Sequence, residues 1–71
     1  MNRRVTNKLI HEGRYAAQVR VELEYGDESW SPTLSLDDAL KLERVRLALR
    51  EGDVAEAAKD ARVFELLPLA G

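Results

Sequence analysis

The sequence predicts an α+β fold, in which a small, mostly antiparallel sheet of three strands packs with two helices in the order β-β-α-α-β. Two observations lead to this prediction. One stretch alternates apolar and polar side chains with a period of two, and two later stretches each open with a side chain that commonly caps a helix. The chain has 71 residues, enough for one domain, which we place at residues 14–71.

The first strand of this domain is predicted over residues 14–25. The odd-numbered side chains from Tyr15 to Tyr25 are apolar, and the even-numbered ones are mostly polar, which is the pattern of a strand with one buried face. We expect this strand to be central in a sheet that is covered on one side only. Residues 1–13 precede it and form either a basic N-terminal arm or a short strand.

A hairpin is predicted after this strand. Gly26 and Asp27 favour a turn, and alternation resumes over residues 30–34. Pro32 has no N–H to donate, so this second strand lies at an edge of the sheet or ends its pairing early. Trp30 either packs under the following helix or anchors an interface, and the two roles are compatible.

A long helix is predicted over residues 36–51, with Ser35 as its N-cap and Gly52 just past its end. Asp37 and Asp38 complement the positive end of its dipole. Its apolar residues fall on two roughly opposite sides. One side holds Leu36, Leu40 and Leu47, and the other holds Leu42, Val45 and Leu49. The sheet covers one side, and a second helix or another subunit covers the other; we therefore predict self-association through Leu42, Val45 and Leu49.

The remaining elements are a short helix and a final strand. Asp53 precedes Glu56 by three residues, a spacing that predicts a capped helix over residues 54–60. Residues 62–69 either extend this helix or form a strand that pairs beside the first. The β-branched and aromatic residues before Pro68 favour the strand.

The composition argues against an enzyme. The chain has no cysteine and a single histidine, His11, so we predict no metal site and no cofactor. No glycine-rich phosphate loop or nucleophile motif is present. No apolar run approaches the roughly 20 residues of a membrane span, and a secretory signal is not evident, so we expect a cytoplasmic protein without membrane contact. A domain this small is marginally stable, which favours a homo-oligomer.

Charge is divided unevenly along the chain. Residues 1–20 carry five basic residues and one acidic residue, and residues 21–71 carry six basic and twelve acidic residues. A basic segment of this kind suits phosphate contacts. An alternative function is therefore a small DNA-binding autoregulator that binds operator DNA through Arg3, Arg4, Lys8 and Arg14.

Four segments carry a resemblance to a known family: YAAQV from Tyr15, WSPTLSLDDA from Trp30, KLERVRLALREGD from Lys41, and AAKDARVFELLP from Ala57. With these segments the chain resembles small bacterial proteins assigned as antitoxins of type II toxin-antitoxin pairs. Thr33 departs from the aromatic residue expected at that position. The resemblance implies a protein that binds a cognate toxin, typically a basic ribonuclease, in fixed stoichiometry.

The residues that would contact such a partner are predicted from the pattern alone. Tyr25 and Trp30 are the predicted apolar anchor near the hairpin. The surrounding carboxylates would supply charge complementary to a basic toxin. These acidic residues are Glu22, Glu24, Asp27 and Glu28.

Overall fold

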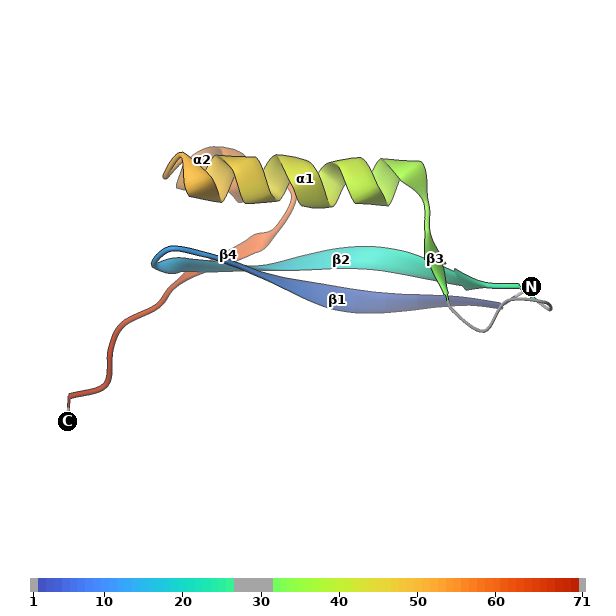
Figure 1. The fold of residues 1–71 in the computed structure, drawn as a ribbon, viewed down its shortest axis with the longest axis horizontal. Helices are drawn as coiled ribbons and strands as arrows, with labels where there is room; N and C mark the ends of the chain where they lie inside the picture. The colour runs from blue at the N-terminus through green and yellow to red at the C-terminus, as the bar shows by residue number, and fades with distance from the viewer. Residues whose placement is uncertain (1, 27–31, 71) are drawn as a thin grey trace.

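The computed structural model describes residues 2–26 and 32–70, which form an antiparallel sheet of four strands with two helices on one side of it (Figure 1). Strand β2 is central: it pairs with β1 along one edge and with both β3 and β4 along the other. The predicted α+β class is confirmed, with one strand more than expected. In chain order the elements are β1 (Asn2–Glu12), β2 (Tyr15–Tyr25), β3 (Thr33–Leu34), α1 (Leu36–Arg50), α2 (Val54–Ala57) and β4 (Arg62–Glu65).

The additional strand is β1, which pairs with β2 over its whole length, from Asn2 opposite Tyr25 to Glu12 opposite Tyr15. A two-residue turn joins the two strands. Its first residue, Gly13, has a φ of 59°, the left-handed conformation that glycine adopts without strain and that opens a type II′ hairpin turn. Residues 2–12 therefore form a strand, which is one of the two predicted alternatives, but the strand is long; the other alternative, a basic arm, is wrong for this segment.

The core lies between the sheet and the helices. The odd-numbered side chains of β2 face α1, as the alternation predicted, and Val19 and Val21 are fully buried there. Ile10 is opposite Ala17 and extends the same layer onto β1. The complete set of buried residues in this cluster is Ile10, Ala17, Val19, Val21, Val45, Ala48, Leu49 and Ala57.

Helix α1 runs along the hairpin, antiparallel to β2, and it buries only one of its two apolar sides (Figure 1). Val45 is 1% exposed and Leu49 is 3% exposed, and Leu42 packs beside them. The predicted self-association through Leu42, Val45 and Leu49 is therefore wrong, because the sheet of the same chain occupies that side. The exposed side is the other one, which carries Leu36, Leu40 and Leu47.

The predicted helix caps are confirmed, and the C-terminal elements are shorter than expected. The backbone N–H of Asp38 donates to Ser35 Oγ, that of Glu56 donates to Asp53 Oδ1, and Gly52 has a φ of 76°. Residues 58–60 turn instead of continuing α2. Strand β4 confirms the strand prediction for its first four residues. It ends where β2 begins, and the N–H of Leu66 then donates to the carbonyl of Arg14 at 2.6 Å.

Asp38 connects the start of α1 to the sheet. Strands β3 and β4 occupy opposite ends of the same edge of β2, and Glu22 lies on β2 between the two pairings. The backbone N–H of Glu22 donates to Asp38 Oδ2 at 2.8 Å. Lys41 lies 3.6 Å from the other carboxylate oxygen. Asp38 thus has a role beyond helix capping, because its carboxylate satisfies a strand N–H that no neighbouring strand reaches.

Replacing Asp38 with alanine is expected to destabilise the fold by about 1–3 kcal/mol, because the Glu22 N–H loses its acceptor. Asp38→Asn keeps an acceptor oxygen and is expected to recover part of this loss. Asp37→Ala, in the same helical turn, is the matched control and should cost only a few tenths of a kcal/mol. Urea unfolding followed by circular dichroism measures all three, and equal effects of Asp37→Ala and Asp38→Ala would contradict the assignment.

The two apolar sides of α1 are expected to respond oppositely to charge. Val45→Asp buries a carboxylate in the core and should abolish folding, since its cost exceeds the stability of a small domain. Leu47→Asp places the same group on an exposed position and should cost less than about 1 kcal/mol. Thermal unfolding of both variants checks the assignment, which fails if Leu47→Asp is the more damaging of the two.

Candidate functional site

The face of the sheet opposite the helices is the main candidate site, and we call it the open face (Figure 1). No other element of the described residues lies across it. Residues directly opposite each other in an antiparallel pair point to the same side of the sheet, so the strand registers define its members. These are Arg3, Val5, Asn7, Leu9 and His11 on β1, Ala16, Gln18, Arg20, Glu22 and Glu24 on β2, Thr33 on β3, and Arg62 and Phe64 on β4.

The open face contains exposed apolar side chains. Leu9 is 72% exposed, Val5 is 47% exposed and Phe64 is 40% exposed. Phe64 is opposite Ala16, and the guanidinium carbon of Arg62 lies 5.2 Å from the centre of the Phe64 ring, within the range of a cation–π contact. An apolar surface bordered by an arginine-aromatic pair has the composition of a protein-binding surface.

Charges of both signs surround these apolar residues. Arg3 Nε lies 3.6 Å from Glu24 Oε1, in an ion pair between neighbouring strands. Glu22 is exposed and lies opposite Val5. Arg20 is also exposed and is the next open-face residue on β2. The open face is therefore acidic toward the C-terminal end of β2 and basic in the middle.

The structure brings only part of the predicted partner-binding set together. Glu22 and Glu24 both lie on the open face. Tyr25 is half-buried on the opposite face of the sheet, because it is an odd-numbered residue of β2. The other three predicted residues, Asp27, Glu28 and Trp30, lie outside the described residues.

The predicted nucleic-acid-binding residues do not share one surface. Arg3 and Arg4 are successive strand residues and therefore point to opposite faces, as do Arg3 and Lys8. Arg14 is in the turn at the far end of β1, more than about 25 Å from Arg4 at the usual rise per strand residue. Arg3 is also partly neutralised by Glu24. The phosphate-binding arm inferred from the charge distribution is thus not supported by the fold.

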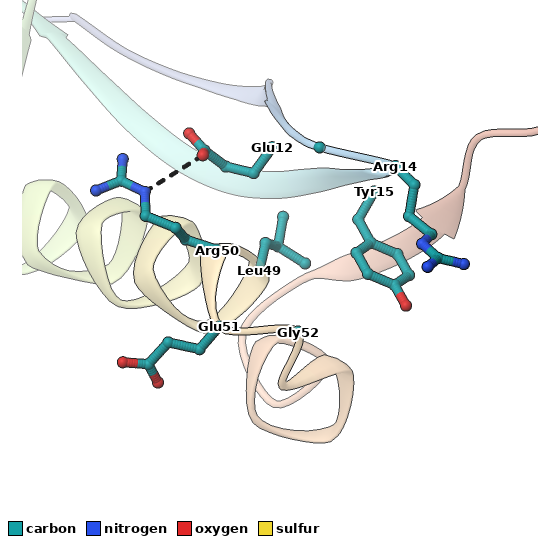
Figure 2. A pocket seen from close by; sticks show the side chains of 8 residues that line it. Glu12, Arg14, Tyr15, Leu49, Arg50, Glu51 and Gly52 are labelled. Atoms are coloured by element: carbon teal, nitrogen blue, oxygen red, sulfur yellow. Dashed lines mark hydrogen bonds and ion pairs between the residues drawn. The ribbon is translucent and has the colours of Figure 1, made fainter.

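A shallow hollow of about 450 Å³ lies where the turn between β1 and β2 meets the C-terminal end of α1 (Figure 2). Tyr15 and Leu49 line it from the two layers, and Glu12 and Arg50 point toward each other at its side. Arg50 Nε lies 3.4 Å from Glu12 Oε1, and Arg46 Nε lies 4.0 Å from Glu12 Oε2. With its carboxylate between two guanidinium groups, Glu12 joins β1 to α1.

Other chemical features of the described residues are few. No group of three His, Cys, Asp or Glu side chains in this part of the chain is arranged to hold a metal ion. Hydrogen bonding to Glu56, and the charge of that residue, raise the pKa of Lys59, which is exposed after α2. Within the same residues, no helix has both the length and the apolar character needed to cross a membrane.

Comparisons of the chain with protein-family models, with curated proteins and with solved structures found no match. The candidate site is therefore defined by the fold and the chemistry of its side chains.

Sequence reasoning missed the apolar members of the open face. Val5 and Leu9 are four residues apart on β1, a spacing that places them on one face once the segment is known to be a strand. The sequence feature that could have revealed them is the short turn at Gly13. A two-residue turn at this position pairs the segment before it with β2 in an antiparallel hairpin. Phe64 was assigned to a strand, but only its register opposite Ala16 shows which face it occupies.

Deleting residues 1–8 is expected to unfold the protein, because the deletion removes most of β1 and leaves one edge of β2 unpaired. Deleting residues 67–71 is the control and should leave the fold intact, because residues 67–70 lie outside the sheet. Circular dichroism and amide exchange of the two truncated proteins test this expectation. A folded protein lacking residues 1–8 would show that β1 is dispensable.

Proposed function

We propose that this protein is an antitoxin that neutralises a cognate toxin by stoichiometric binding, and that the open face is its contact surface. The observation that carries the proposal is the exposed apolar group of Val5, Leu9 and Phe64 on a sheet face that no helix of the described residues covers. The antitoxin role follows from the sequence resemblance, and the choice of surface follows from the fold.

The composition of the open face supports a protein partner. Binding energy at protein interfaces is concentrated in a few residues, among which aromatic side chains and arginine are enriched. Phe64 and Arg62 provide such a pair, already in contact with each other. Because both are held on a strand paired with β2, little ordering is needed on binding, and less of the interaction energy is lost.

The charges of the open face indicate how a basic toxin would be oriented. Glu24 is already paired with Arg3, so its charge is partly compensated within the chain. Glu22 is exposed, and it forms no ion pair with another described residue. The acidic end of the open face would thus meet a basic patch of the toxin and speed association, while Phe64 and Leu9 supply apolar contact area.

Phe64→Glu is expected to weaken or abolish binding to the toxin, because it places a charge in the apolar contact. Leu47→Glu is the matched control, since Leu47 on α1 is exposed to nearly the same extent, 44% against 40% for Phe64. The measurement is co-expression of each variant with the product of the adjacent gene. Complex formation is followed by size-exclusion chromatography with light scattering, and neutralisation is followed by relief of growth arrest.

Circular dichroism of both variants must first show the parent fold. The proposal for the open face is supported if Phe64→Glu loses the complex and Leu47→Glu retains it. The reverse result would move the contact surface to the exposed side of α1. If the unmodified protein forms no complex and relieves no arrest, the antitoxin assignment itself is wrong.

A further inference from the structure

The outer edge of β1 is the longest unpaired backbone segment in the described part of the chain. β1 has 11 residues, and β2 occupies only one of its edges. A long open edge presents a row of N–H and C=O groups that readily pair with another strand, and proteins usually cover or blunt such edges. On the other side of the sheet, the edge of β2 is already occupied by β3, Asp38 and β4.

We infer that β1 pairs with β1 of a second copy of the chain, in an antiparallel register centred on Asn7. Two-fold symmetry about an axis perpendicular to the sheet requires each residue to meet a partner on the same face. Faces alternate with a period of two, so the two residue numbers of every pair must add to an even sum. The register centred on Asn7 meets this condition and pairs β1 along its full length.

The side chains of β1 favour this register over its neighbours. In the register centred on Asn7, Val5 of each copy lies opposite Leu9 of the other copy, so this apolar pair occurs twice on the open face. No two side chains of like fixed charge lie directly opposite each other in this register. A shift by two residues in one direction sets Arg4 opposite Lys8. A shift by two in the other direction sets Lys8 opposite Lys8 at the symmetry axis, although it also sets Arg4 opposite Glu12. Larger shifts leave the strand ends unpaired.

Charge and apolar character therefore select the same register. With the centre at Asn7, Arg3 lies opposite His11 and Arg4 lies opposite Ile10, so each arginine meets a side chain without a fixed positive charge. The exposed side chains of Val5 and Leu9 from the two copies form one apolar strip across the new strand pair. Such a dimer would have one continuous sheet, with its helices on one side and both open faces on the other.

A cysteine scan tests the register directly, because the chain has no native cysteine. Position 7 is the only residue of β1 that meets its own copy, at a Cα separation within the range for disulfides. Asn7→Cys is expected to form a disulfide-linked dimer on mild oxidation. Val5→Cys and Leu9→Cys, on the same face, should each form little disulfide-linked dimer alone and should cross-link when mixed with each other. Equal cross-linking at all three positions, or none at position 7, would overturn the register.

Two double variants test whether this pairing holds the dimer. Val5→Lys with Leu9→Lys sets lysines opposite each other across the dimer axis and should give a monomer of 8.0 kDa. Val5→Lys with Leu9→Glu sets lysine opposite glutamate and should retain the dimer. Both substitutions replace exposed side chains, and circular dichroism verifies the fold of each variant.

Sedimentation velocity of the unmodified chain and the two variants gives the decisive comparison. The inference is overturned if the unmodified chain is monomeric at about 100 µM, a concentration at which weak micromolar dimers are populated. It is also overturned if the two double variants associate equally, since another surface would then hold the copies together. A chain that is monomeric alone and takes an acidic peptide strand on β1 would identify a different occupant of this edge. No toxin is present in these experiments, so their outcome is independent of the proposed antitoxin function.

Discussion

The packing of α1 against the odd-numbered side chains of β2 determines how the rest of the chain is arranged. The core layer contains Val19, Val21 and Val45 together with several alanines, so the helix approaches the sheet closely. The clustered buried apolar residues of the described chain form this single core layer between the sheet and the helices. The opposite face of the sheet has no second helix among the described residues, and most of its side chains remain in contact with solvent.

The two faces of the sheet therefore differ in structural role. On the helical side, ion pairs join separate elements: Glu12 joins β1 to α1, and Asp60, after α2, pairs with Arg44 on α1. On the open face, the ion pair of Arg3 and Glu24 lies within the sheet itself. The side chains of the open face are thus not needed to fasten one layer to another. A surface whose side chains do not hold layers together is suited to an interaction role such as the proposed antitoxin contact.

Local signals in the sequence predicted much of this fold. The alternation over β2 is clear because every second residue enters the core, and Ser35, Gly52 and Asp53 mark helix ends through their own backbone chemistry. Strand β1 lacks such a pattern, since its helix-facing side also carries Thr6 and Lys8. The strand conformation of β1 depends on its pairing with β2, and the local sequence of β1 does not indicate that pairing.

The same distinction applies to the candidate site. The positions of Glu22 and Glu24 on the solvent-exposed side of β2 follow from residue parity alone, and both were anticipated. The apolar residues beside them come from other strands, so their place depends on the registers of β1 and β4. The two sides of α1 show a similar limit. Both are apolar in sequence, and only the packing shows that the sheet takes Val45 and Leu49.

The carboxylate of Asp38 has a further consequence for how copies of the chain can assemble. By accepting the N–H of Glu22, it occupies a backbone donor on the short stretch of the β2 edge that β3 and β4 leave open. A sheet with two free edges can recruit strands at both ends and grow into a fibre, whereas a sheet with one free edge cannot propagate. Pairing of β1 with its own copy would use the one long free edge of the described sheet. The outer edges of β3 and β4 that remain are two and four residues long, so strand addition beyond two chains would be disfavoured.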